Sequence, residues 1–222
     1  MNQHTVTAFD EDLQFLVSKI SEMGGNAESM VARSVSGLLT ADKSLGQAVV
    51  ADDKLLDALQ MEVDEHVVLL IAKRQPMAKD LREAIGALRM ATDLERIGDL
   101  GKNIARRSFQ IDETIPPKRL QRGLQHLTNV ALEQLKDSLD AYAAKDTEKA
   151  RVVWDRDDEI DSLYTSLFRE LLTYMMEDPR NITYCTHLLF CAKNMERIGD
   201  HVTNLAETTH YIVTGKTNMG NS

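Results

Sequence analysis

The pentapeptide Glu-Arg-Ile-Gly-Asp occurs twice in this chain, at residues 95–99 and again at residues 196–200. The similarity continues beyond the pentapeptide, because an Asn-x-Ala sequence follows each copy at the same distance, at 103–105 and at 204–206. Two matching stretches at one fixed offset indicate an internal duplication. A chain of 222 residues is long enough for two small domains, so the sequence predicts two halves of similar structure.

Apolar residues recur every three or four positions through most of each half, which is the spacing of one face of an α-helix. Prolines mark the breaks near 76, 116 and 179, and Gly46 lies in the turn after the first stretch. Proline suits the first turn of a helix but not its interior. The helical stretches are about 8–43, 47–74 and 76–110 in the first half, and about 118–145, 146–176 and 181–214 in the second. Short connections make neighbouring helices antiparallel. The predicted fold is all-α, with two tandem antiparallel three-helix bundles at residues 1–113 and 114–222.

The composition restricts the compartment and the kinds of partner. The formal net charge is −9, whereas affinity for nucleic acid depends on positive charge that neutralises phosphates. We find no apolar run of bilayer length and no signal peptide at the N-terminus. The two cysteines, Cys185 and Cys191, fall on different faces of a helix, so no disulfide between them is expected. These features predict a soluble cytoplasmic protein that does not bind nucleic acid.

Each repeated pentapeptide carries two carboxylates four positions apart within a predicted helix. A helical wheel places both acids of each copy roughly opposite the apolar stripe that faces the core. Like charges at this spacing repel each other, and a glycine inside a helix costs about 1 kcal/mol relative to alanine. A second acid pair lies off the apolar stripe of the preceding helix in each half. If these two helices lie side by side, each half gathers four carboxylates.

Four carboxylates close together suit a metal site. Ligand sets made only of oxygen favour hard cations or iron, and a bound cation would cancel the repulsion between the acids. The candidate metal ligands are Asp53, Asp57, Glu95 and Asp99 in the first half, and Asp157, Asp161, Glu196 and Asp200 in the second. The alternative is that these acids are solvated and form ordinary surface ion pairs with Arg96 and Arg197. The residues by themselves leave both interpretations open.

Both motif helices also carry a second, partly apolar face that leads along the helix to the acids. In the first half it consists of Leu81, Ala84, Leu88 and Ala91, and in the second of Ile182, Cys185, Leu189 and Ala192. A simple bundle helix needs only one apolar stripe. The second face therefore predicts contact with the other bundle, with a second copy of the chain or with a partner.

The remaining candidate residues are a histidine and a series of arginines, and they indicate a function less clearly than the acids do. His201 follows an acid of the second pentapeptide and is a candidate extra ligand in that half only. Arg82, Arg89 and Arg96 recur every seven residues, which favours pairing with acids such as Asp93 or, less often, binding of a phosphate or an acidic partner. We find no Ser-His-Asp or Cys-His set at recognisable spacing, so no enzymatic activity is predicted.

Four groups of residues, taken together, characterise the chain. They are both copies of Glu-Arg-Ile-Gly-Asp, the residues that follow them at 103–105 and 204–206, Gln-Pro-Met-Ala-Lys-Asp-Leu-Arg at 75–82, and the closing Thr214-Gly215. Together they resemble the PhoU family of phosphate-signalling regulators, and the resemblance covers essentially the whole chain. The second half departs from it at 178–180, because Asp-Pro-Arg lacks the Asp-Leu-Arg that follows in the first half.

The resemblance implies more than the residues alone. It implies bundles that often form a homodimer and, in some members, multinuclear metal clusters on the acid motifs, with the ion left open among iron, zinc, nickel, manganese and magnesium. It also implies a non-enzymatic negative regulator of phosphate uptake and of phosphate-starvation signalling. Such a protein bridges the ATPase of the phosphate ABC transporter and a sensor histidine kinase, and meets the membrane only through these partners. The alternative function is a metal-binding or metal-storage bundle.

Overall fold

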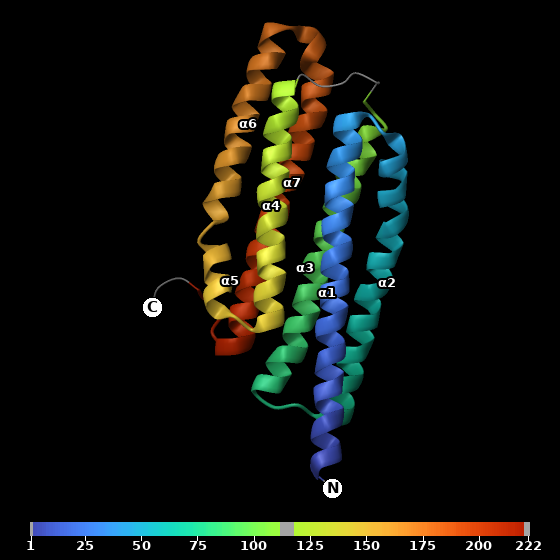
Figure 1. Cartoon of the computed structure of the whole chain (residues 1–222), viewed down its shortest axis with the longest axis vertical. Helices are drawn as coiled ribbons and strands as arrows, with labels where there is room; N and C mark the ends of the chain where they lie inside the picture. Colours follow the sequence, from blue (N-terminus) through green and yellow to red (C-terminus); the bar gives the residue numbers. More distant parts are fainter. Residues whose placement is uncertain (1, 112–117, 220–222) are drawn as a thin grey trace.

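The computed structural model describes residues 2–111 and 118–219, and it describes side chains from residue 9 onward. The first half consists of α1 (Asn2–Thr40), α2 (Lys43–Arg74) and α3 (Lys79–Ser108), and the second of α4 (Lys118–Ala144), α5 (Thr147–Trp154), α6 (Asp157–Glu177), the short 3-10 helix η1 (Pro179–Asn181) and α7 (Ile182–Thr214). The two antiparallel bundles stand side by side (Figure 1). The predicted all-α fold is confirmed for these residues, whereas the predicted boundary between residues 113 and 114 lies outside them.

The same turn chemistry joins the first and second helices of each half. Ala41 and Lys145 adopt left-handed φ angles of 56° and 53°, and an aspartate follows each of them. Asp42 accepts a hydrogen bond from an amide in the first turn of α2 at 2.9 Å, and Asp146 accepts two from amides of α5 at 3.0 Å. Because these amides have no partner within the helix, each cap stabilises the fold by about 1 kcal/mol. The first cap also starts α2 earlier than the predicted residue 47.

The middle helix of the second half is divided, whereas the sequence predicts one helix over 146–176. Asp155 and Arg156 separate α5 from α6. The buried side chain of Gln134 on α4 donates to the Arg156 carbonyl at 3.3 Å, and the Arg156 side chain donates to Glu159 at 2.9 Å. These contacts hold the break against α4. They place Asp157 in the first turn of α6, where the helix dipole favours negative charge.

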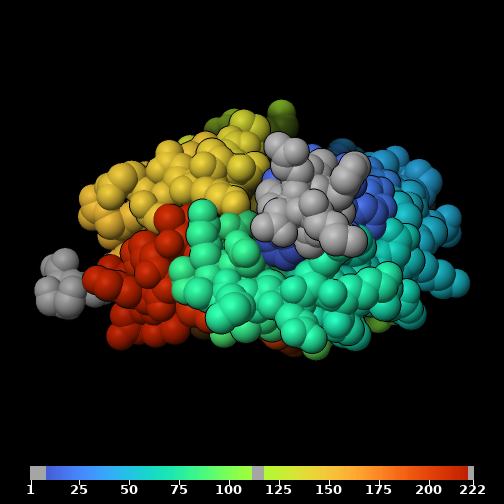
Figure 2. Space-filling model, turned by 90° about the horizontal axis from the view of Figure 1, so that it is seen from below, coloured from blue at the N-terminus to red at the C-terminus, as the bar shows by residue number. Residues whose placement is uncertain are grey.

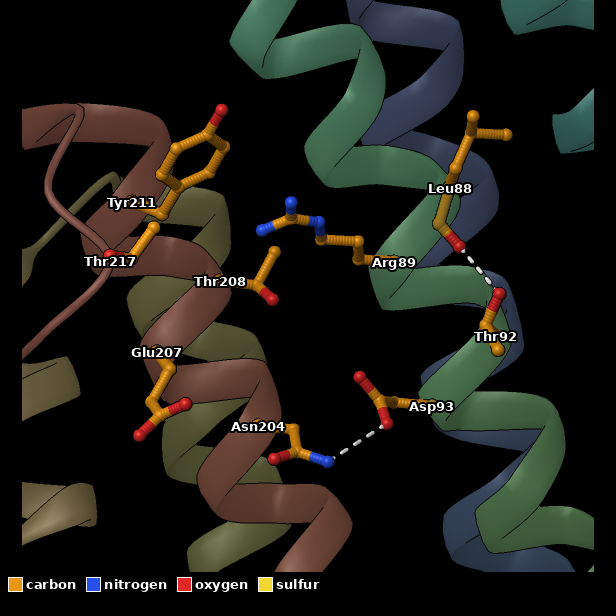
Figure 3. Close-up of a pocket in the computed structure, with 9 residues that line it drawn as sticks. All are labelled: Leu88, Arg89, Thr92, Asp93, Asn204, Glu207, Thr208, Tyr211 and Thr217. Atoms are coloured by element: carbon orange, nitrogen blue, oxygen red, sulfur yellow. Dashed lines mark hydrogen bonds between the residues drawn. The ribbon is translucent and has the colours of Figure 1, made fainter.

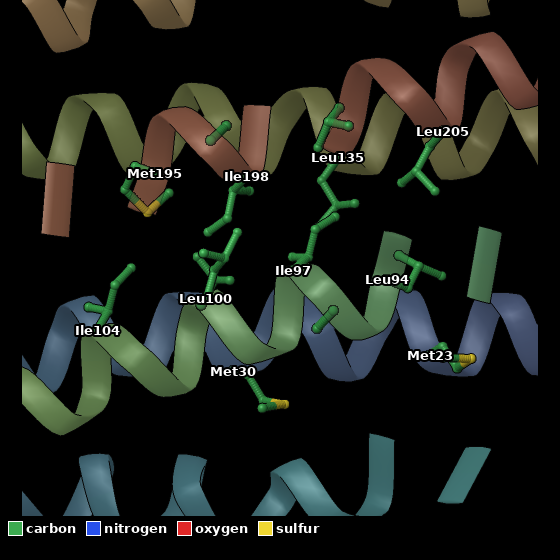
Figure 4. Packing of buried hydrophobic residues seen from close by; sticks show 14 of the residues in the cluster. Met23, Met30, Leu94, Ile97, Leu100, Ile104, Leu135, Met195, Ile198 and Leu205 are labelled. Atoms are coloured by element: carbon green, nitrogen blue, oxygen red, sulfur yellow. The ribbon is translucent and has the colours of Figure 1, made fainter. Parts of the chain in front are cut away.

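One continuous hydrophobic core joins the two bundles, because α3 and α7 lie side by side at the centre of the molecule (Figure 1). Gly86 of α3 contacts Ile212 of α7, and without a side chain on Gly86 the two helices approach closely. Leu100 of α3 points toward Ile198 of α7 (Figure 4). Burial of apolar surface therefore holds the halves together in addition to the chain that connects them.

One end of the molecule brings parts of both halves together. There the connection between α2 and α3 lies next to the C-terminal end of α7 (Figure 2). The Lys145 ammonium, in the turn between α4 and α5, donates to Glu83 Oε2 of α3 at 2.6 Å. Glu83 is largely buried whereas Lys145 is exposed, so this partly solvated ion pair ties the first half to the second at the edge of their contact.

Large apolar side chains are exposed on the outer helices of both halves. Val68 and Leu69 of α2 are exposed, as are Phe168, Leu172 and Met176 of α6. Exposed apolar side chains at helical spacing are typical of surfaces that contact other proteins. In the part of the chain that the structure describes, no helix has both the length and the apolar character needed to span a bilayer.

Candidate functional site

The four predicted ligands of the first half lie on α2 and α3, and a lysine lies among them. The Lys102 ammonium donates to Asp53 Oδ2 at 2.7 Å and to Asp99 Oδ1 at 2.5 Å. Of these side chains, 16%, 14% and 29% of the surface is exposed, whereas Asp57 lies on the surface. Because the ammonium contacts an acid on each helix, it links α2 to α3 and neutralises part of the negative charge.

Glu95, the remaining acid of the first half, is half-buried. Burial and the neighbouring Asp99 raise the pKa of Glu95, and the nearby Arg96 opposes this shift. Arg96 lies 3.5 Å from Glu95 and 3.7 Å from Asp99, so the surface ion pairs of the alternative interpretation are present in this half. The Arg96 side chain is mostly exposed, and each pair therefore stabilises the fold by less than about 1 kcal/mol.

The four predicted ligands of the second half lie on α6 and α7, where three of them are exposed. The Thr203 hydroxyl donates to Asp157 Oδ1 at 2.8 Å. Burial and the carboxylate of Glu196 raise the pKa of both Asp161 and Asp200. Among the described residues, no lysine or arginine forms an ion pair with Asp157 or Asp161, the two predicted ligands on α6. Lys193 of α7 pairs with Glu196 and opposes the pKa shifts of Asp161 and Asp200, but in the described part of the chain no cation bridges α6 to α7 at these acids.

Glu196 is the most buried acid of this second group. Its Oε1 accepts a hydrogen bond from the Lys193 ammonium at 2.5 Å. Its Oε2 is buried and has no hydrogen-bond partner among the described residues. A buried carboxylate oxygen without a partner raises the free energy of the folded state. An ion or a water molecule at this oxygen would remove that penalty.

The two halves differ as hosts for a metal ion. Within the described ranges, no three His, Cys, Asp or Glu side chains are arranged to hold one. In the first half, the Lys102 ammonium already lies between Asp53 and Asp99, so these residues do not fit a metal ion. In the second half, the corresponding position is Thr203, and an oxygen-only set of donors with an unpaired Glu196 Oε2 has the chemistry of a hard-cation site.

The glycine of each pentapeptide makes room for an apolar side chain of the preceding helix. Gly98 contacts Leu56 of α2, and a Cβ at Gly199 would lie 2.9 Å from Ile160 Cδ1 of α6. The acid-bearing side of each motif helix is therefore covered, at the glycine, by a helix of the same half. The predicted second apolar face does not include the glycines, and its Leu88 lines the space between α3 and α7, where it meets the other bundle. The space next to the glycines is filled by leucine and isoleucine rather than by an ion.

His201 does not join the second acid group, and of the arginines spaced seven residues apart only Arg96 pairs with the first acid group. His201 Nδ1 lies 2.8 Å from Asp93 Oδ1 of the other half, so the histidine serves the contact between the bundles. The Arg89 guanidinium lies 4.7 Å from the centre of the Tyr211 ring, also across this contact. Arg96 instead pairs with the acids beside it. The seven-residue spacing thus does not produce one basic surface.

A groove of about 470 Å³ lies between α3 and α7 (Figure 3). Arg89 and Asp93 of α3 line one side, and Thr208 and Tyr211 of α7 line the other. One Asp93 oxygen accepts a hydrogen bond from an asparagine of α7, while the Arg89 guanidinium extends across the groove toward Tyr211 (Figure 3). The groove was not predicted, because it exists only where helices from different halves meet.

Fold and site together define a class of protein, an all-helical tandem repeat with paired acids on neighbouring helices of each bundle. The family model described as "PhoU domain" matches this chain twice, at residues 20–108 and 124–209. Together these matches cover most of the chain, one in each bundle. The chain therefore belongs to the PhoU family.

Relatives of known name and structure agree with this assignment. The chain is 58% identical to "Phosphate-specific transport system accessory protein PhoU homolog" of Rhizobium meliloti, over 98% of this chain and 92% of that protein. It is 49% identical to the protein of the same name from Caulobacter vibrioides, over 97% and 94% of the two chains. The crystal structure of PhoU from Pseudomonas aeruginosa superimposes with a TM-score of 0.89 at 36% identity, covering 94% of this chain and all of that one.

Proposed function

We propose that this protein regulates phosphate transport as an accessory protein of a phosphate-specific transport system. The observation that carries this proposal is the near full-length similarity, at 58% identity, to a protein named for that role in Rhizobium meliloti. The match extends over both bundles, because it covers 98% of this chain. A protein that shared only the helical fold and had another function would not need to resemble that relative over its whole length.

The proposed role is non-enzymatic and depends on contacts with other proteins. The expected partners are the ATPase of a phosphate ABC transporter and a sensor histidine kinase, and the expected form is a homodimer in the cytoplasm. Exposed apolar side chains on α2 and α6 support a function through protein contacts, because each half presents such a surface on its outer helix. In this role the protein lowers phosphate uptake and the phosphate-starvation response when phosphate is plentiful.

A gene deletion tests the proposal. Loss of the protein should raise the expression of phosphate-starvation genes in high-phosphate medium, and the wild-type gene in trans should restore repression. Leu172→Asp on the outer face of α6 should restore it less well if that surface binds a partner. Asp64→Ala, which changes an exposed acid of α2, is the control and should restore repression fully. Unchanged expression in the deletion strain would reject the proposed function.

Metal binding is the second candidate function, and the second half supports it better than the first. Glu196 Oε2 is buried and has no hydrogen-bond partner in the part of the chain that the structure describes, and Asp157, Asp161 and Asp200 supply further oxygen donors. Elemental analysis of protein purified without an affinity tag tests this candidate. Retained metal that is lost in Glu196→Gln would support it. Absence of metal, together with normal regulation by the same variant, would reject a functional metal site.

A further inference from the structure

Lys102 and Thr203 occupy the same position in the two repeats. Each lies three residues after the second acid of its pentapeptide, Asp99 or Asp200. Each side chain contacts the first acid of the predicted ligand pair on the facing helix. Lys102 Nζ lies 2.7 Å from Asp53 Oδ2, and Thr203 Oγ1 lies 2.8 Å from Asp157 Oδ1. The lysine is a cation, whereas the threonine is neutral. The two repeats therefore share this contact between helices but differ in its charge.

The charge matters because an ammonium group and a metal ion compete for the same oxygens. Carboxylate oxygens bind divalent cations at about 2.0–2.6 Å, and Lys102 already contacts one oxygen of Asp53 and one of Asp99. Two cations between the same carboxylates repel each other strongly in a partly buried site. A metal ion could enter only after Lys102 had moved into water, and only 16% of this side chain is exposed.

We propose that Lys102 is the permanent counter-ion of the first-half carboxylates, and that this half takes no divalent metal ion. In the second half, Thr203 replaces the lysine, and among the described residues no cation bridges the corresponding Asp157 and Asp200, although Lys193 pairs with Glu196 nearby. The two repeats thus respond differently to cations although their acids have the same spacing. The assignment concerns one side chain and the ions that it excludes, and it does not depend on the proposed role in phosphate transport.

The test uses the full-length protein without an affinity tag, stripped of metal by a chelator, with Mn²⁺ alone as the probe. Equilibrium dialysis followed by elemental analysis measures the Mn²⁺ bound per chain. In the wild type, we expect this content to stay the same when Asp53→Asn and Asp99→Asn are introduced together. Lys102→Thr should bind one more Mn²⁺ per chain than the wild type, and adding Asp53→Asn to this variant should remove the extra ion.

Lys102→Arg keeps the positive charge and is the matched control, for which we expect no additional Mn²⁺. Circular dichroism monitors the fold of each variant. Should Lys102→Thr unfold after chelation, refolding in Mn²⁺ would support the proposal, and no recovery would count against it. Loss of Mn²⁺ from the wild type on substitution of Asp53 and Asp99 would overturn the proposal. An unchanged Mn²⁺ content in folded Lys102→Thr would overturn it as well, whatever the protein does in phosphate regulation.

Discussion

His201 Nδ1 on α7 lies 2.8 Å from Asp93 Oδ1 on α3, and this contact joins the two bundles in the middle of α3. Asn204 Nδ2 of α7 donates to the same oxygen at 3.3 Å. The Asp93 side chain is only 16% exposed, so water competes weakly for these hydrogen bonds. A largely buried carboxylate of α3 thus contacts two side chains of α7. We therefore expect this contact to stabilise the packing of one bundle against the other.

We expect Asp93→Ala to lower the free energy of unfolding by about 1–3 kcal/mol, because His201 and Asn204 lose their shared acceptor. Urea denaturation followed by circular dichroism measures this change. Asp64→Ala removes an exposed acid of α2 and is the control, with an expected effect below about 0.5 kcal/mol. Equal effects of the two substitutions would mean that the contact between the bundles adds no stability.

Gly98→Ala should lower the free energy of unfolding by about 1–3 kcal/mol, because the new methyl group would overlap the buried side chain of Leu56. Gly25→Ala is the matched control on α1, where no atom lies within 4 Å of an added Cβ. The control should instead raise stability by up to about 1 kcal/mol through the better helix propensity of alanine. Chemical denaturation compares the two variants, and a gain for Gly98→Ala would show that Leu56 moves aside freely.

The pH dependence of stability tests the repulsion in the second acid group. Burial and Glu196 raise the pKa of Asp200 in the folded state, so folding favours its protonated form. This contribution is fully present below the unfolded pKa, about 3.9, and is lost as the pH rises through the folded pKa. At neutral pH the charged Asp200 therefore repels its neighbours.

Asp200→Asn should accordingly stabilise the chelator-treated protein at neutral pH, by about 0.2–0.5 kcal/mol. The gain should shrink as the pH falls toward about 4, because the wild-type carboxyl then also becomes neutral. Urea denaturation at several pH values gives the comparison, with Asp64→Asn as the control for loss of one surface charge. A gain that stays constant with pH would contradict this account.

The turn between α4 and α5 offers a test of capping. Asp146→Ala should cost about 1 kcal/mol in the free energy of unfolding, since two amides of α5 lose their acceptor. Asp146→Asn keeps a side-chain oxygen at this position and should cost much less. If asparagine proves as damaging as alanine in thermal denaturation, the charge rather than the cap is what stabilises the turn.

Prediction from the sequence succeeds for local features and fails for features that another helix sets. The apolar stripe predicts the helices because its spacing is a property of one segment. The break at Asp155 and Arg156 could not be predicted in this way, because it is held by Gln134 from α4. The groove beside Arg89 is likewise formed by two helices that are distant in the sequence.

For the candidate site, the spacing of the acids predicts that two pairs lie on the same side of their helices, and the structure places the pairs of each half on neighbouring helices. The bridge of Lys102 between Asp53 and Asp99 was not predicted, although the spacing of Lys102 from Asp99 places both on one face of α3. The proposed metal ligands remain a prediction, which the experiments on Glu196 and Lys102 address.

The sequence by itself determined that this protein is a duplicated all-helical chain of the PhoU type with an acid motif in each half. Those properties follow from residue identity and spacing along single segments, which are encoded locally. Only the tertiary structure decided that Lys102 bridges the acids of one half, that Thr203 contacts Asp157 at the corresponding place in the other, and that Asp93 contacts His201 across the bundles. Charge and hydrogen bonding depend on distances between helices, and packing of the whole chain sets those distances.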